Sequence, residues 1–231
     1  MTSDNMQLRA KAILFDLDGT LVNTILAVEK QYTIWANKMG IDPQPIIEYC
    51  HGVRSIEVMN KFAPAGRVIT IEEANAWEVL LENESEGVFV VPGVVELLNK
   101  LPRERWAIVT SGTRSMAEGR LRQMNLPIPD IFITADVVTH GKPHPEGYLT
   151  AASKLGFKPE ECIIFEDAPA GIDAGVNGGI RSIAITTSYK PEILHKAVAI
   201  IDNYHDLEVE QVTDDEDKPE FVFTVLNNKK N

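Results

Sequence analysis

Long apolar runs and cysteine are both scarce in this sequence of 231 residues. No segment approaches the roughly 20 apolar residues that a membrane helix needs, and residues 1–10 are too polar for a secretory signal. We therefore expect a soluble, cytoplasmic protein with no membrane partner. The two cysteines, Cys50 and Cys162, lie outside any Cys-x-x-Cys or Cys/His spacing. They are expected to be free thiols in a reducing compartment, and neither suggests zinc.

Basic residues are also under-represented, with 22 Lys and Arg against 34 Asp and Glu and a formal net charge of -12. This balance disfavours nucleic acid and anionic membranes as partners, because both require a field of the opposite sign. Part of the excess is local, since Asp214-Asp215-Glu216-Asp217 is typical of a solvated turn. A small anionic substrate would therefore depend on a few well-placed cations.

Two acids follow the apolar run at residues 12–15, in the order Asp16-Leu17-Asp18-Gly19-Thr20. The run predicts a short buried strand, and ligands of open parallel sheets bind at the carboxyl ends of their strands. Acids this close repel unless a cation lies between them or one holds a proton. A metal site, an acid–base pair and a plain turn are all open at this point. A calcium loop is excluded because glycine comes fourth instead of sixth.

The next 65 residues or so read as helices without a convincing strand. Apolar residues recur at steps of three and four from Ile25 to Met39, and Gly40 gives a helix stop. We expect this stripe, which includes Val28 and Tyr32, to be packing. Further helices are predicted at residues 43–49, 54–63 and 70–86, the last with a capping box. The region is interpreted as a helical insert.

From residue 88 onwards, short β-rich runs alternate with helical stretches. The predicted strands are 106–110, 131–135, 162–165, 182–186 and, more weakly, 198–201; the helices are 94–100, 114–125, 146–155 and 170–177. Together with the opening strand they predict an α/β fold, a doubly wound parallel-sheet core. An edge hairpin is expected at about residues 208–225.

Three later strand ends carry polar residues with a chemical use. Ser111-Gly112 opens a helix, where free backbone N–H groups favour binding of an oxyanion. The same residues would also be expected if the serine were only a helix cap. Lys142 projects from a loop stiffened by two prolines and could pair with a phosphate or be a surface lysine. Glu166-Asp167 ends a buried strand, and such hard oxygen ligands suit magnesium.

Taken in order, Asp-x-Asp-Gly-Thr, Ser-Gly, Lys-Pro and Glu-Asp each follow a strand, and this series resembles the haloacid dehalogenase-like hydrolase superfamily. The resemblance covers essentially the whole chain. It implies a catalytic core at residues 1–22 and 90–231 and a small α-helical cap at 23–89. The wording of the motifs is most similar to the sugar and polyol phosphatase branch, which includes glycerol and 2-deoxyglucose-6-phosphate phosphatases.

The resemblance implies roles for the acids. Asp16 would attack phosphorus to form an aspartyl-phosphate, and Asp18 would protonate the leaving alcohol and then activate water. Magnesium would be held by Asp16, the backbone carbonyl of Asp18 and Asp167, with Glu166 binding directly or through water.

The resemblance also implies how the substrate is held. Ser111, the amide of Gly112 and Lys142 would bind the phosphoryl oxygens. In the insert, His51 and Arg54 of His-Gly-Val-Arg are expected to face a small phosphorylated sugar, polyol or glycerol, against the alternative of a loop filler and a surface arginine. Arg114 would touch the substrate or only flank the site.

Position 23 is Asn23, where many members of the family carry a second acid, and this departure concerns the start of the first insert helix rather than the chemistry. A β-phosphoglucomutase is the alternative enzyme. Such mutases tend to carry histidine at the position of Val28, so hydrolysis is preferred. A non-catalytic phosphometabolite sensor is the third hypothesis, and it is disfavoured because all the catalytic acids are present.

Overall fold

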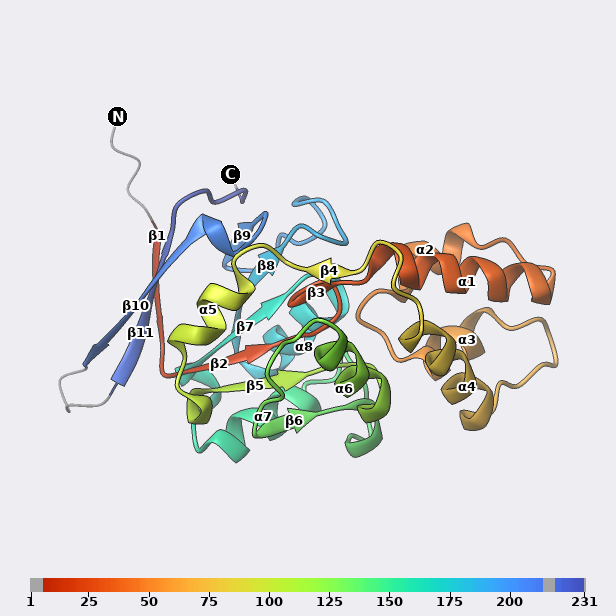
Figure 1. The fold of residues 1–231 in the computed structure, drawn as a ribbon, viewed down its shortest axis with the longest axis horizontal. Helices are drawn as coiled ribbons and strands as arrows, with labels where there is room; N and C mark the ends of the chain where they lie inside the picture. The colour runs from red at the N-terminus through yellow and green to blue at the C-terminus, as the bar shows by residue number, and fades with distance from the viewer. Residues whose placement is uncertain (1–5, 214–218, 231) are drawn as a thin grey trace.

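The structure is a computed structural model that describes residues 6–213 and 219–230. A central sheet is flanked by helices, and a group of four helices stands to one side of it (Figure 1). The acidic turn expected at Asp214 to Asp217 lies outside the described residues. Within the described parts of the chain, no helix has the length and apolar character required to cross a membrane.

The central sheet has six parallel strands in the order β6-β5-β2-β7-β8-β9. These strands are β2 (Ala12–Phe15), β5 (Trp106–Val109), β6 (Ile131–Ile133), β7 (Cys162–Glu166), β8 (Arg181–Ile185) and β9 (Ala199–Ile201). The opening strand β2 lies between β5 and β7, so its carboxyl end is central. The predicted doubly wound α/β core is confirmed.

Both faces of the sheet are covered, which explains why β2 is apolar throughout. Its alternate residues Ile13 and Phe15 belong to the hydrophobic cluster of α5 and α6, whereas Ala12 and Leu14 belong to that of α7. All four side chains are fully buried. The helices are α5 (Val94–Lys100), α6 (Arg114–Gln123), α7 (Glu146–Leu155) and α8 (Pro169–Gly178), and the 3-10 turns are η1 (Arg103–Arg105), η2 (Ala135–Val137), η3 (Pro159–Glu161) and η4 (Tyr204–Asp206).

Four helices between residues 25 and 82 form what we call the helical lobe, which has its own hydrophobic cluster. They are α1 (Ile25–Met39), α2 (Gln44–Cys50), α3 (Ser55–Phe62) and α4 (Ile71–Glu82). The chain enters the lobe through β3 (Val22–Asn23) and leaves it through β4 (Phe89–Val90), and these strands pair antiparallel.

Local signals at the ends of the lobe helices act as predicted. Gly40 ends α1 in the left-handed conformation, and the capping box at Thr70 starts α4. The side chain of Asn23 accepts a hydrogen bond from the Ile25 amide at 3.2 Å, one residue before the N-cap Thr24 of α1. Helix α4 ends at Glu82 instead of residue 86, because the following segment turns toward α1, where Lys30 pairs with Glu84 and Glu86.

The predicted C-terminal hairpin exists, but it is not an edge of the main sheet. Strands β10 (Leu207–Thr213) and β11 (Pro219–Val225) form a separate antiparallel sheet with β1 (Met6–Ala10), and β11 is the central strand. Strand β1 was missed by the sequence patterns. Phe221 and Phe223 of β11 join the core cluster, with the Phe223 ring centroid 5.8 Å from that of Phe165. The small sheet thus covers part of the main core.

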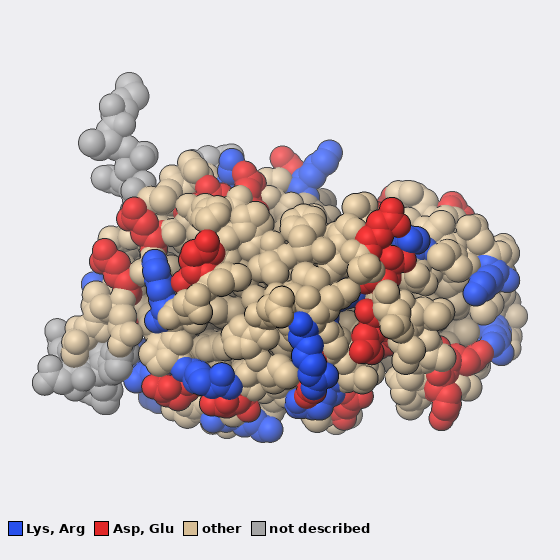
Figure 2. All heavy atoms as spheres, in the orientation of Figure 1, with Lys and Arg blue, Asp and Glu red and all other residues tan. Residues whose placement is uncertain are grey.

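Charged side chains are unevenly placed on the face drawn in Figure 2. Acidic residues gather near the junction between the helical lobe and the sheet, while acidic and basic residues are interspersed elsewhere on this face. The junction therefore carries negative charge on its outside.

Candidate active site

The carboxyl ends of β2 and β7 place three acids around one buried lysine. Lys142 Nζ lies 2.5 Å from Asp16 Oδ1 and 2.7 Å from Glu166 Oε1. The exposed fraction is 6% for Lys142, 3% for Asp16 and zero for Glu166 and Asp167. Three of the four predicted motifs therefore meet at one point, although Asp16 lies 126 residues from Lys142 in the chain.

Glu166 is fully engaged by protein groups. Besides Lys142, its carboxylate accepts hydrogen bonds from the Tyr148 hydroxyl at 3.0 Å and from the amides of Asp167 and Ala168 at 2.9 Å. Both oxygens are used in this way, so the carboxylate is fixed in orientation. Glu166 thereby holds the Lys142 ammonium beside Asp16.

The remaining charge at this point fits a divalent cation. Carboxylate oxygens of Asp16, Glu166 and Asp167 lie within 4.8 Å of one another. If all three ionise, the Lys142 ammonium leaves two negative charges uncompensated. Burial raises the pKa of Asp16 to about 7 against the opposing charge of Lys142, and burial also raises the pKa of Asp167 well above its ordinary value. A hard dication such as Mg2+ would restore the ionised forms.

Asp167 is held in place by its neighbours, and Gly19 is required to make room for it. The hydroxyl groups of Thr20 and Ser188 donate to the two Asp167 oxygens, the first at 3.4 Å. Gly19 has a φ of +87°, and a Cβ there would lie 1.9 Å from Asp167 Oδ2. The glycine of Asp-x-Asp-Gly thus serves both the turn and the close approach of the acid.

Asp18 is placed differently from Asp16. Its Oδ1 atom is buried and has no hydrogen-bond partner among residues 6–213 and 219–230. Burial raises the pKa of Asp18, and the charge of Arg120 opposes the shift. The raised pKa of Asp18 favours its protonated form relative to an exposed carboxyl, whereas Asp16 lies against the Lys142 ammonium.

A pocket opens above these acids, between the sheet and the helical lobe. It is lined from the sheet side by Asp16, Asp18, Ser111 and Gly112, among others. A Cβ at Gly112 would lie 2.2 Å from the Met116 methyl, so a larger residue here would displace the Met116 side chain. The predicted phosphate seat and the two acids therefore share one cavity.

The two insert residues expected at the substrate are separated by the structure. His51 lines this pocket, with its Nε2 3.4 Å from a Glu29 oxygen. Arg54 instead pairs with Glu57, donates to the Thr139 carbonyl at 3.4 Å and lines a neighbouring pocket. That neighbouring pocket also includes Ser111 and Lys142.

The apolar stripe of α1 does more than pack. Val28 and Tyr32 belong to the hydrophobic packing of the lobe, as predicted, and they also line the active-site pocket. The helix lies across the pocket, and its buried face therefore continues into the cavity. Arg114, in contrast, donates to Glu118 and the Phe132 carbonyl and does not line the pocket with Asp16.

Glu78 of α4 is a pocket residue that the sequence patterns missed. Its carboxylate is buried, accepts the Ser55 hydroxyl at 2.5 Å, and accepts the Thr113 amide and hydroxyl at 2.9 and 2.5 Å. Thr113 precedes α6, whose positive N-terminal end favours an anion. The available signal was an acid in phase with the buried Ala74 and Leu81.

Arg120 of α6 is a second missed contact to the lobe. It is fully buried and donates to the carbonyls of Leu81 and Glu84 at 2.9 Å and to the Gln123 side chain at 2.6 Å. Helix α4 is thus held against α6 by hydrogen bonds of its own Glu78 and of Arg120. At the other side of the lobe, the Ser111 hydroxyl donates to the Gly52 carbonyl at 2.8 Å.

Comparison with known proteins identifies the family of this chain. The profile of the family described as haloacid dehalogenase-like hydrolase matches residues 13–185. Hexitol phosphatase A of Escherichia coli is 37% identical over 89% of this chain and 95% of its own. Glycerol-1-phosphate phosphohydrolase 2 of Saccharomyces cerevisiae is 35% identical over 96% of this chain and 94% of its own. The crystal structure of a hydrolase from Pseudomonas syringae superposes with a TM-score of 0.73 and 28% sequence identity. The match covers 84% of this chain and 94% of that hydrolase chain.

Proposed function

Because the chain belongs to the haloacid dehalogenase-like hydrolase family, we propose that it hydrolyses phosphate esters of small sugars, polyols or glycerol through an aspartyl-phosphate on Asp16. It is a phosphoric monoester hydrolase of this family. The main support for this proposal is the contact of Asp16 with Lys142 beside a pocket that also contains Asp18 and the Ser111-Gly112 loop.

The chemistry divides between the two acids of Asp-x-Asp. The Asp16 carboxylate attacks phosphorus, the bond to the alcohol oxygen breaks, and Asp18 gives its proton to that oxygen. Asp18 then takes a proton from water, whose oxygen attacks phosphorus and releases Asp16 and inorganic phosphate. The raised pKa of Asp18 and its unpaired Oδ1 support this role, because it must hold a proton before the first step.

Asp16, Asp167 and the backbone carbonyl of Asp18 would hold Mg2+. Mg2+ would keep Asp16 ionised and offset the charge of the phosphoryl oxygens. Glu166 has both oxygens occupied by Lys142, Tyr148 and two amides, which supports a link to the ion through water rather than directly.

Substrate binding is assigned to both sides of the pocket. Ser111, the Gly112 amide and Lys142 would bind the phosphoryl oxygens, as preorganised donors for developing charge. We propose that residues 23–89 are a cap over a core of residues 1–22 and 90–231, and that the cap reads the alcohol. His51 and the Glu78 carboxylate offer hydrogen-bond partners to hydroxyl groups, and the buried charge of Glu78 disfavours substrates with a second anionic group.

A mutase is less consistent with the pocket, because its lining includes the apolar Val28 where the related mutases tend to carry histidine. We also assign the enzyme to the cytoplasm, in keeping with two cysteines that are buried and free. The test is a panel of phosphorylated metabolites with phosphate detection, run with Mg2+ and with EDTA. Wild type should release phosphate only with Mg2+, and Asp16→Asn should release none. Activity that survives this substitution would overturn the mechanism.

A further inference from the structure

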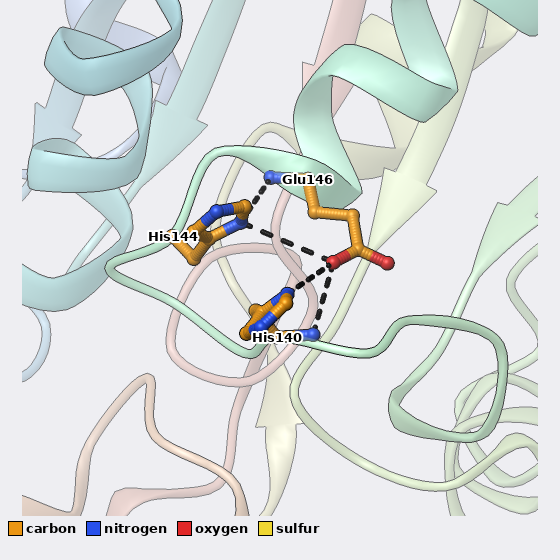
Figure 3. A group of neighbouring side chains, drawn as sticks. All are labelled: His140, His144 and Glu146. Carbon is orange, nitrogen blue, oxygen red and sulfur yellow. Dashed lines mark hydrogen bonds and ion pairs between the residues drawn. The ribbon is translucent and has the colours of Figure 1, made fainter.

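A second group of metal-binding side chains lies on the loop that carries Lys142. His140 and His144 flank Lys142 in the chain, and both approach Glu146 at the start of α7 (Figure 3). His140 Nδ1 is 3.0 Å and His144 Nδ1 is 3.9 Å from the same Glu146 oxygen. None of these three residues has a part in the hydrolysis described above.

We propose that His140, His144 and Glu146 form a site for a borderline transition-metal ion such as Zn2+, separate from the magnesium site. Two imidazoles and one carboxylate are a ligand set that suits Zn2+, and imidazole is a poor ligand for Mg2+. In a tetrahedral Zn2+ site with nitrogen and oxygen ligands, neighbouring ligand atoms lie about 3.3 Å apart. The observed 3.0 and 3.9 Å bracket that spacing, and all three ligand atoms lie within 4.8 Å of one another.

The carboxylate of this site is held in position before any ion arrives. Glu146 accepts the amides of Thr139 and His140 at 2.7 and 3.0 Å, and these hydrogen bonds keep the pKa of its carboxyl at about 2. Both histidine side chains are at least half exposed, so an ion can reach them from solvent. Fixed ligand orientation of this kind favours metal binding.

The location gives the ion an effect on the active site. The two histidines line the same pocket as Lys142 and Ser111. An ion that joins His140 to His144 would therefore close a short ring of backbone around Lys142. The loop that presents the catalytic ammonium would be stiffened.

Zn2+ titration calorimetry with Mg2+ in large excess tests the site, with Co2+ absorption as a spectroscopic measure. The variant is the double substitution His140→Ala/His144→Ala, and the matched control is His195→Ala, an exposed histidine outside the group. We expect one Zn2+ per chain in wild type and control, and at least about tenfold weaker binding in the double variant, equivalent to about 1.4 kcal/mol.

Thermal unfolding gives a second readout, because an ion bound only to the folded state raises Tm. Zn2+ should raise the Tm of wild type and His195→Ala more than that of the double variant. Two results would overturn the proposal: wild type that binds no Zn2+ in the presence of Mg2+, or a double variant that binds it as tightly as wild type.

Discussion

Asp16 allows the charge balance of the active site to be tested through protein stability, without reliance on turnover. The ordinary pKa of the group is 3.8, and burial raises the pKa of Asp16 to about 7. A raised pKa gives stability that is complete below the unfolded value and is lost as pH rises through the folded value. Between pH 5 and pH 8 the unfolded group is already ionised, while the folded group loses its proton. At about 1.4 kcal/mol per pH unit, the expected loss from this group is about 3 kcal/mol without a divalent ion.

The assay is urea unfolding at several pH values in EDTA, for wild type and for Asp16→Asn. The variant is the matched control because asparagine has the same size and does not titrate. The difference between the two free energies of unfolding should change by about 3 kcal/mol from pH 5 to pH 8, with wild type losing relative stability. Saturating Mg2+ should reduce this change, because the cation favours the ionised carboxylate.

Identical pH dependence of wild type and Asp16→Asn in EDTA would refute the reasoning about burial. An Mg2+ stabilisation that is equal in both proteins at pH 8 would refute the assignment of Asp16 to the magnesium site. Asp167→Asn offers an internal check. Its Mg2+ stabilisation should also fall, because Asp167 is assigned to the same ion.

Three further substitutions test the pocket by steady-state kinetics. Lys142→Met should lower kcat by about 100-fold or more, because it removes a fixed cation beside the transferred phosphoryl group; a loss confined to KM would contradict this role. His51→Ala should lower kcat/KM for good polyol phosphates more than Arg54→Ala does, since only His51 lines the pocket with Asp16. The reverse order would show that Arg54 reads the alcohol. Glu78→Gln should raise kcat/KM for carboxylate-bearing phosphate esters relative to neutral ones by about tenfold, and an unchanged ratio would remove Glu78 from substrate selection.

The residues at the strand ends could be predicted because local chemistry and sheet topology agree there. Asp16 and Glu166 each follow a fully apolar strand, and parallel strands bring their carboxyl ends to one edge. The capping box at Thr70 and the stop at Gly40 were similarly local signals. Their physical cause lies within a few residues of chain, so the sequence displays it directly.

The contacts between the lobe and the sheet could not be predicted in this way. Glu78 and Arg120 read as ordinary charged positions on helices, and only the docking of α4 on α6 makes them buried partners. The same holds for β1, whose pairing with β11 joins the two ends of the chain. For Arg54 the substrate contact stays a prediction: in the structure it contacts Glu57 and Thr139 and lines the pocket that contains Ser111 and Lys142.

The central claim is that the Asp16 carboxylate becomes phosphorylated during turnover. Rapid mixing with a good polyol phosphate and Mg2+, followed by acid quenching and peptide mass spectrometry, measures this directly. We predict one phosphoryl group on the peptide that contains Asp16, its removal on longer incubation, and its absence in Asp16→Asn. Rapid phosphate release with no phosphoryl group on this peptide, or with the group on another residue, would contradict the account.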